Sequence, residues 1–557
     1  MLHIIFHRFA KHPSTYRAAV SATALLMCVT LLPTMPVTAT TTTMTRDELL
    51  QYQQQFEDPQ ASDATTGHTH QDHVPTQDSA GPMAAAGVDP ADTLKPLALN
   101  VGGRWSSLRT LPAGTNAYHM IMGPGGKIVL IAGSGNDANV FAAGTFKAYM
   151  WSPTQGIQKT LTVPIDMFCA GHMLLSNGKG LAVGGTSGYK PWKGARATYT
   201  FDFTSETFVR QTDMQHGRWY PTVIGTPGGD AVITGGYDQN GLNSGYGEFW
   251  KTSTNGLSNL PGKRVFPLYP HIFVVHDGRY FFNGAAYNSG INGKAIHPAG
   301  FWDPLTNSFT PVSGLQYPHR RSGAASCFIG DARRQHMIVI GGGSPALSNT
   351  NTISFGQNPP TFRTSPSLRV TKTYMNCVNL PDESILEVGG GATNQVVNAS
   401  RSVSQLAVGW KSWKQMNPLP AGQHRLYHSM AFLLDDGRVV SMGSNPSGQP
   451  RSDTVLVYEP PYLFRGTRPT IGALPPRITY GQTVRLTVSP GVTKIAMMTS
   501  ASPTHAMDVN QRAVYFPVVN GQVKIDVSPN KFPRNQVRFF AIDNKGAVSK
   551  ARWTALY

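Results

Sequence analysis

The chain repeats one short pattern seven times between residues 104 and 460. In each copy, two apolar strands joined by a turn end in a glycine-containing step, as in MLLSNGKGLAVGG and VIGTPGGDAVITGG. One glycine marks each copy, and successive markers lie 48 to 57 residues apart: Gly133, Gly184, Gly235, Gly284, Gly341, Gly389 and Gly443. A β-rich period of about 50 residues predicts one four-stranded sheet per repeat, because each unit buries its apolar face against its neighbours. The sequence therefore predicts an all-β body of seven such units.

This repeat length is typical of kelch β-propellers, so we expect a seven-bladed propeller over residues 104–460. Segments with a turn signal amid aromatics, such as FWDPLTNSFT, recur between the hairpins and predict the outer strands. After residue 460 the period is lost. Alternating stretches such as TVRLTV and QVRFFAI predict a separate immunoglobulin-like β-sandwich over residues 461–557.

The first 39 residues have the features of a secretory signal: basic residues, an apolar run and the small-residue cleavage site Val37-Thr38-Ala39. An uncleaved membrane anchor is the alternative, although two prolines interrupt the run before it reaches the roughly 20 residues that a span needs. Residues 40–103 are polar and of low complexity, which predicts a flexible linker. Three linker histidines could hold a metal loosely, but a polar linker needs no such role: His68, His70 and His73. We expect a secreted protein, with attachment to the cell surface left open.

The formal net charge is +17, and the cations are scattered along the chain without a nucleic-acid-binding motif. We therefore expect affinity for acidic polysaccharides or cell surfaces rather than for nucleic acid, and a monomeric protein.

Three cysteines follow the signal segment: Cys169, Cys327 and Cys377. An odd number in an exported protein leaves at least one outside any disulfide. We expect Cys327 and Cys377 to be buried free thiols rather than a disulfide, because propeller blades rarely need cross-bracing.

The first strands of propeller blades run along the central axis, so equivalent positions in different repeats form a ring. The positions fifteen residues before each marker glycine are Tyr118, Cys169, Tyr220, Tyr269, Ser326, Tyr374 and His428. The fifth hairpin is longer than the others, so the count fits Ser326 least well. Tyr427 adjoins the ring at His428, and both can face one centre only if the strand start is bent.

The ring is rich in groups that bind or reduce metals. Imidazole and phenolate donors suit Cu(II), and Cys169 shares the ring level with Tyr220. A thiol held against a tyrosine ring could be oxidised to a thioether, which would explain the odd cysteine. The alternative is that these aromatic residues pack against neighbouring blades.

The stretches FCAGH, RWYPT, RLYHS, EPPYLFRGTRPTI and PTHAMDVNQR, in this order, resemble the galactose oxidase and glyoxal oxidase family of copper radical oxidases. The resemblance covers about residues 104–557. It implies one copper ion with four protein ligands, Tyr220, Tyr427, His428 and His505. It also implies that Tyr220 is joined to Cys169 by a thioether as a radical cofactor, and that Tyr427 is the general base.

The resemblance implies oxidation of small aldehydes to carboxylic acids, or of primary alcohols to aldehydes, with O2 as acceptor and release of H2O2. The stretches RWYPT and PLYPHIFVVHDGRYFF are closer to the glyoxal oxidase branch, which favours aldehydes. Tyr118, Tyr269 and Tyr374 could line the substrate mouth or simply pack. Where galactose oxidase stacks a tryptophan on its cross-linked cysteine, this chain has Tyr237 and Asp238, and Trp250 lies farther along.

The rival hypothesis is a secreted, non-catalytic propeller that binds glycans or cell-surface partners, because propellers host many functions. Such a module would be expected to have lost at least one of the five motif residues, and all five are present. A hydrolytic propeller of the sialidase kind would need an arginine cluster that the ring positions do not supply.

Overall fold

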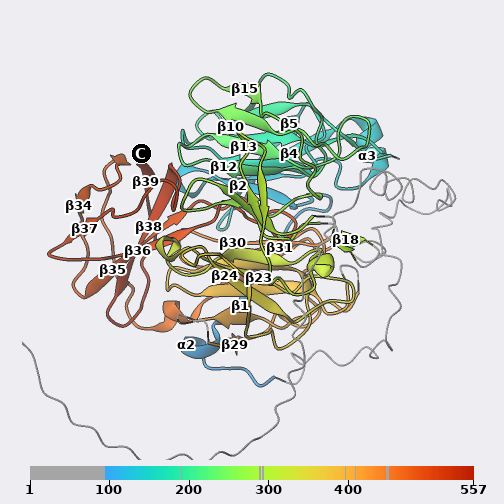
Figure 1. Cartoon of the computed structure of the whole chain (residues 1–557). Coiled ribbons are helices and arrows are strands. Elements are labelled where there is room, and N and C mark those ends of the chain that lie inside the picture. Colours follow the sequence, from blue (N-terminus) through green and yellow to red (C-terminus); the bar gives the residue numbers. More distant parts are fainter. Residues whose placement is uncertain are drawn as a thin grey trace, which may run out of the picture. The chain divides into compact units, whose positions relative to one another are not determined.

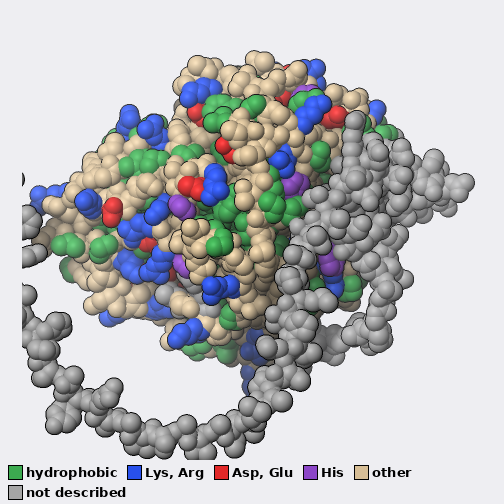
Figure 2. Space-filling model, in the orientation of Figure 1, with side chains coloured by type: hydrophobic (Ala, Val, Ile, Leu, Met, Phe, Trp, Pro, Cys, Tyr) green, Lys and Arg blue, Asp and Glu red, His purple; other side chains and the backbone are tan. Residues whose placement is uncertain are grey.

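The computed structural model describes residues 94–557, apart from 190, 288–289, 292–293, 296, 395–396, 408, 410 and 447–450. All of these belong to one compact unit, Thr41–Tyr557. The predicted signal segment, the linker up to residue 93 and the linker histidines lie outside the described residues. Within the described part, no helix has both the length and the apolar character needed to cross a membrane. Over the face drawn in Figure 2, Lys and Arg side chains are spread out rather than gathered in one patch.

The described residues form seven antiparallel four-stranded sheets between residues 104 and 459 (Figure 1). Each predicted hairpin supplies the first two strands of one sheet, and nearly all side chains of these strands are buried. Six sheets take their strands in chain order: β2 (His119–Met122), β3 (Ile128–Ile131), β4 (Phe146–Ser152) and β5 (Gly156–Val163); β6 (Ala170–Leu174), β7 (Gly180–Gly184), β10 (Thr198–Asp202) and β11 (Thr207–Arg210); β12 (Thr222–Gly225), β13 (Ala231–Thr234), β14 (Glu248–Lys251) and β15 (Gly256–Asn259); β16 (Ile272–Val274), β17 (Tyr280–Phe282), β20 (Gly300–Trp302) and β21 (Phe309–Pro311); β22 (Ala325–Phe328), β23 (His336–Ile340), β24 (Thr350–Ser354) and β25 (Arg363–Ser365); β26 (Thr373–Asn379), β27 (Ile385–Gly391), β28 (Ser404–Leu406) and β29 (Trp413–Gln415).

The seventh sheet joins the two ends of the repeat region. It consists of β30 (Ser429–Leu433), β31 (Val439–Gly443), β32 (Thr454–Glu459) and β1 (Arg104–Thr110). β1 pairs antiparallel with β32 although they lie about 350 residues apart in sequence. The helix α2 (Leu99–Gly102) precedes β1, and the Asn417 amide donates to the carbonyls of Leu97 and Gly103. Leu97 and Gly103, which fall in the range predicted as linker, therefore contact the repeat region.

The first strands of successive sheets lie side by side: β2 with β6, β6 with β12, β12 with β16, β22 with β26, and β26 with β30. All seven marker glycines have a positive φ, between 56° and 86°. A Cβ atom at Gly184 would lie 2.2 Å from the Arg218 carbonyl oxygen of the next sheet. Glycine is therefore required there for both the left-handed turn and the close approach of neighbouring sheets.

Cys327 and Cys377 form a disulfide, so the expectation of two free thiols is wrong. They lie on β22 and β26, and the side-by-side packing of these strands brings the two Cα atoms to 6.6 Å. The repeat pattern predicts that both residues lie on first strands of neighbouring sheets. It does not predict how far one strand is shifted along the other, and this shift decides whether the two thiols meet. Cys169 lies outside this disulfide and is buried.

The C-terminal residues form a five-stranded sheet and a two-stranded sheet on one apolar core that includes Phe516, Phe532 and Phe539 (Figure 1). The larger sheet has the order β33 (Arg477–Ile478), β39 (Arg552–Leu556), β38 (Asn535–Asp543), β35 (Val492–Thr499) and β36 (Ala513–Pro517), and the smaller pairs β34 (Thr483–Arg485) with β37 (Gln522–Lys524). The remaining elements are short: β8 (Thr186–Gly188) paired with β9 (Lys193–Gly194), β18 (Gly290–Ile291) paired with β19 (Lys294–Ala295), α3 (Ala138–Ala143), and the 3-10 turns η3 (Pro124–Gly126), η4 (Pro318–Arg320), η5 (Ala332–Arg334) and η6 (Pro461–Phe464).

The segment between β35 and β36, residues 500–512, binds the first strands of several sheets. Asn510 Nδ2 donates to the Val223 carbonyl of β12 at 2.9 Å, and Gln511 Nε2 donates to the Cys377 carbonyl of β26 at 2.8 Å. The Ser500 hydroxyl donates to the Met122 carbonyl of β2. A segment that contacts three different first strands lies among them, and it carries His505.

Candidate metal centre

The starts of the first strands are bent where the ring residues lie. Cys169, Tyr220, Tyr269, Tyr374 and His428 all have a positive φ, between 44° and 66°. A left-handed conformation costs a residue with a Cβ atom about 1–2 kcal/mol, so the surroundings must hold it. The Tyr220 N–H donates to the Cys169 carbonyl at 2.9 Å, and the Tyr269 N–H donates to the Tyr220 carbonyl at 2.8 Å. These bonds link consecutive ring positions to one another.

The fifth repeat departs from the count. Its left-handed residue is Gly323, with a φ of 63°, and Ser326 lies three positions later within β22. The Ser326 hydroxyl instead bonds to His271 Nδ1 at 2.6 Å. The placement of Ser326 on the ring is therefore wrong, because the longer hairpin shifts the register.

Tyr427 and His428 approach one centre from different directions, as a bent strand start allows. The left-handed turn falls at His428, with a φ of 62°. The Tyr427 hydroxyl hydrogen-bonds with the Tyr220 hydroxyl from a sheet 207 residues away in sequence. All three side chains are buried.

His505 lies at the tip of a tight turn. The backbones of Thr504 and Met507 exchange two hydrogen bonds of 2.9 and 2.8 Å, and His505 and Ala506 have φ values of 47° and 67°. Positive φ at both central positions is a type I′ turn, which normally takes Asn and Gly. The turn brings the His505 ring centroid to 4.6 Å from that of His428 and 4.9 Å from that of Tyr220.

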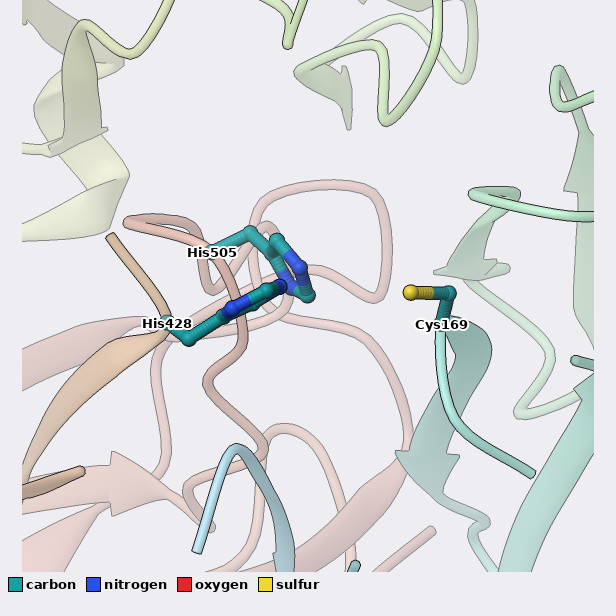
Figure 3. A group of neighbouring side chains, drawn as sticks. All are labelled: Cys169, His428 and His505. Carbon is teal, nitrogen blue, oxygen red and sulfur yellow. The ribbon is translucent and has the colours of Figure 1, made fainter. Parts of the chain in front are cut away.

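Five predicted residues thus meet at one buried centre: Cys169, Tyr220, Tyr427, His428 and His505. The ligand atoms of Cys169, His428 and His505 lie within 4.8 Å of one another. Figure 3 shows the Cys169 sulfur pointing toward the two imidazole rings. Burial, and next the Cys169 thiol, raise the pKa of Tyr220 well above its ordinary value. A neighbouring metal cation would offset this cost, and two imidazoles with two phenolic oxygens match the donors that Cu(II) prefers.

The protonation of His428 follows from its backbone partner. His428 Nδ1 lies 3.3 Å from the Asn445 carbonyl oxygen. A carbonyl can only accept, so Nδ1 carries the proton of the neutral ring and Nε2 carries the lone pair that a metal needs.

Two neighbours, His119 and Thr504, determine the protonation of His505. The Cys169 N–H donates to His119 Nε2 at 3.0 Å. Burial lowers the pKa of His119 well below its ordinary value, so the ring is neutral and its proton lies on Nδ1. That nitrogen donates to the Thr504 hydroxyl oxygen at 2.8 Å.

The same hydroxyl oxygen lies 2.6 Å from His505 Nδ1 and 3.3 Å from the Tyr118 carbonyl. A hydroxyl has one proton and two lone pairs. If the proton goes to the carbonyl, which can only accept, both lone pairs accept from the two imidazoles. This assignment satisfies every partner, and it leaves His505 Nε2 with its lone pair.

His119 and Thr504 were not predicted as site residues from the sequence. Both residues adjoin a predicted site residue: His119 directly follows Tyr118, and Thr504 directly precedes His505. Tyr287, whose ring centroid lies 5.1 Å from that of Tyr220, was not predicted either.

Tyr118, Tyr269 and Tyr374 are buried around the centre. Tyr118 stacks on His428 at 5.0 Å and 26°, and Tyr269 lies 4.7 Å from His505 and donates to a backbone carbonyl. Tyr374 lies 5.2 Å from Tyr427. These contacts pack the ligand side chains, and the role of the three residues in lining a substrate mouth stays a prediction.

Among the described residues, the aromatic ring with its centroid nearest to that of Tyr220 belongs to the preceding residue in the sequence. Trp219 lies edge-on to Tyr220 with centroids 4.0 Å apart, and Tyr237 stacks on Trp219 at 5.6 Å and 15°. Trp250 is buried in a separate apolar cluster with other residues of the second and third sheets, as expected for an outer-strand aromatic.

A buried arginine holds the strand start that carries Tyr220. Arg218 Nη1 donates to the carbonyl of the marker glycine Gly235 at 2.9 Å, and Arg218 Nε pairs with Glu248 at 3.3 Å. Both side chains of the pair are at most 2% exposed. Arg218, two positions before Tyr220, is thus bonded to the third sheet, and removing one partner of such a pair would leave an uncompensated buried charge.

Comparison with known proteins identifies the relatives of this chain. Residues 468–556 match the galactose oxidase-like early set domain. Galactose oxidase from Gibberella zeae is 25% identical over 451 residues, which are 75% of this chain and 64% of that protein. The chain therefore spans slightly less than two thirds of that relative. Aldehyde oxidase GLOX from Vitis pseudoreticulata is 24% identical over 461 residues, 72% of this chain and 83% of that protein.

A solved structure shares the fold. It is described as a novel fungal alcohol oxidase with catalytic diversity among the AA5 family, in complex with copper. The two structures align with a TM-score of 0.68 over 82% of this chain and 99% of that one, at 19% sequence identity. The chain is thus related to proteins named galactose oxidase and aldehyde oxidase GLOX, which confirms the resemblance inferred from its motifs.

Proposed function

We propose that the chain is a copper radical oxidase that converts small aldehydes to carboxylic acids, or primary alcohols to aldehydes, with reduction of O2 to H2O2. The observation that carries this proposal is the meeting of Cys169, Tyr220, Tyr427, His428 and His505 at one buried centre. The relatives named as oxidases and the copper-bound structural neighbour support it.

The residues present fit a copper site. Tyr220, Tyr427 and the Nε2 atoms of His428 and His505 would hold the ion. Bound copper would accept one electron from the substrate, return it later to O2, and lower the pKa of the phenols that bind it. Oxidation of an alcohol or a hydrated aldehyde removes two electrons, so a second one-electron site is needed. Tyr220 serves as this site, joined to Cys169 through a bond between the sulfur and the phenol ring. Forming this bond removes two hydrogens, which O2 takes up as H2O2.

Tyr427 and Tyr220 each remove one hydrogen from the substrate, the first as a proton and the second as a hydrogen atom. The Tyr427 oxygen takes the proton of the substrate hydroxyl, and the oxidised Tyr220 oxygen takes a hydrogen atom from the adjacent carbon. The hydrogen bond between their hydroxyls holds the two phenol oxygens side by side. The hydroxyl and the adjacent carbon of one bound substrate can therefore reach both oxygens. Burial of the pair excludes water from the radical.

We propose further that the seven sheets are blades of one closed propeller over residues 104–460. The pairing of β1 with β32 and the neighbouring first strands support closure. The domain of residues 461–557 is an immunoglobulin-like sandwich, and its function is to send His505 into the ring. The disulfide between Cys327 and Cys377 supports secretion, because such bonds persist in oxidising compartments.

The proposal is tested with purified, copper-loaded protein. A panel of small aldehydes and primary alcohols is screened for H2O2 release and O2 uptake, with Tyr220→Phe as the variant and Trp250→Phe as the control. We expect peroxide with at least one aldehyde, equal to the O2 consumed, in wild type and control but not in Tyr220→Phe. Copper-loaded wild type that releases no peroxide with any member of the panel would favour the glycan-binding propeller instead.

A further inference from the structure

A chain of oxidisable aromatic rings leads from Tyr220 to the protein surface. Trp219 lies against Tyr220 with centroids 4.0 Å apart, and Trp192 stacks on Trp219 at 4.9 Å and 13°. Tyr189 follows Trp192 at 4.3 Å. Tyr220 and Trp219 are buried, whereas Trp192 and Tyr189 are partly exposed. Every consecutive pair of rings is therefore close to van der Waals contact.

The outer half of this chain is held in place by backbone contacts. Trp192 and Tyr189 lie in the connection between β8 and β9, in the second repeat, while Trp219 precedes the first strand of the third. The Gly194 N–H donates to the Asp238 carbonyl at 2.8 Å, which anchors this connection to the third repeat. The Tyr189 hydroxyl bonds to the Ser134 hydroxyl at 2.6 Å.

The residue types distinguish this chain from ordinary packing. Within the fourth and fifth sheets, most contacting aromatic rings are phenylalanine, with Tyr280 and Trp302 beside them: Phe273, Phe281, Phe301, Phe328 and Phe355. Phenylalanine packs as well as tyrosine or tryptophan but is far harder to oxidise. From Tyr220 outward, each ring is instead tryptophan or tyrosine, the side chains that lose one electron most readily.

We propose that Trp219, Trp192 and Tyr189 conduct electrons between Tyr220 and one-electron oxidants at the protein surface. The proposal rests on the proposed function, because it requires Tyr220 to alternate between phenol and radical. One electron leaves Tyr220 through the chain and reduces the oxidant, and the Tyr220 phenolic proton passes to the Tyr427 oxygen. An outer-sphere metal complex such as ferricyanide, which becomes ferrocyanide, would in this way convert protein that holds Cu(II) and an unoxidised Tyr220 to the radical form without substrate.

The experiment starts from protein loaded with Cu(II) in which Tyr220 is not oxidised, and follows ferricyanide reduction in a stopped-flow instrument. Radical formation is measured by the visible absorbance of the tyrosyl radical and by loss of the Cu(II) paramagnetic resonance signal, because a radical bound to Cu(II) couples to the copper spin. Trp192→Phe and Tyr189→Phe interrupt the chain at partly exposed positions and keep an aromatic ring. Trp250→Phe is the matched control, because Trp250 is equally aromatic but lies in a separate cluster, and its indole nitrogen makes no hydrogen bond among the described residues.

We expect the Trp192→Phe variant to form the radical roughly tenfold more slowly than wild type or more slowly still, a barrier increase of at least about 1.4 kcal/mol. Its final radical yield should equal that of wild type, and Trp250→Phe should react at the wild-type rate. Equal rates in wild type, Trp192→Phe and Tyr189→Phe would overturn the conduction route and leave the proposed function intact. A wild type that forms no radical at all would overturn both.

Discussion

Substituting Thr504 should disturb the centre specifically, because its hydroxyl orients the imidazoles of both His119 and His505. Replacing Thr504 with valine keeps the shape of the side chain and removes the oxygen that accepts from His119 Nδ1 and His505 Nδ1. Each buried donor left without an acceptor costs about 1–3 kcal/mol. His505 can avoid this cost by moving its proton to Nε2, which removes the lone pair that faces the centre.

The expected consequence is a loss of copper affinity in addition to a loss of stability. Removing an outer-shell hydrogen bond to a metal ligand typically weakens metal binding by about 10- to 100-fold. The corresponding change in binding free energy is about 1.4–2.7 kcal/mol. The copper dissociation constant, measured by competition with a chelator of known affinity, checks this, and Thr504→Ser is the matched control because it retains the hydroxyl.

The copper affinities of the two variants show whether the Thr504 hydroxyl is needed. We expect Thr504→Ser to bind copper within a few-fold of wild type and Thr504→Val to bind it far more weakly. If valine and serine variants bind copper equally well, the hydroxyl does not set the protonation of His505, and the reasoning from Thr504 is wrong.

Three further predictions concern stability. Glycine at Ala506 should stabilise the protein by up to about 1 kcal/mol, since the φ of 67° is strained for alanine, and denaturant unfolding checks the sign. Replacing Cys327 and Cys377 together by serine should cost about 4 kcal/mol, because the disulfide closes a loop of 50 residues, and an unchanged melting curve would contradict this. Burial raises the pKa of Asp166 from 3.8 to about 6, so the folded state retains a proton between these values that the unfolded state has lost. As pH rises through that window, wild type should lose up to about 3 kcal/mol relative to Asp166→Asn, and parallel pH–stability curves of the two proteins would refute this.

The sheets and most of the ring could be predicted because their determinants are local. Each marker glycine combines a left-handed turn with a close approach, so it must recur at the same point of every repeat. Fixed spacing from the glycine then selected Cys169, Tyr220 and His428. Where the spacing changes, as in the longer fifth hairpin, the prediction placed Ser326 where the structure has Gly323.

Features that depend on how separate segments align were not predicted. The disulfide between Cys327 and Cys377 requires a particular register of two neighbouring first strands. The bond between His119 and Thr504 joins residues 385 positions apart, from the first sheet and the C-terminal domain. No repeat relates these two segments, so the sequence pattern does not indicate that they meet.

A redox cofactor formed by Cys169 and Tyr220 requires a covalent bond between their side chains, and peptide mass spectrometry detects this bond. Protein matured with copper in air is digested and compared with Cys169→Ser treated in the same way. We predict a joined peptide containing Cys169 and Tyr220, two hydrogens lighter than the sum of the separate peptides, in wild type alone. Solely unlinked peptides from fully copper-loaded wild type would contradict the radical oxidase account.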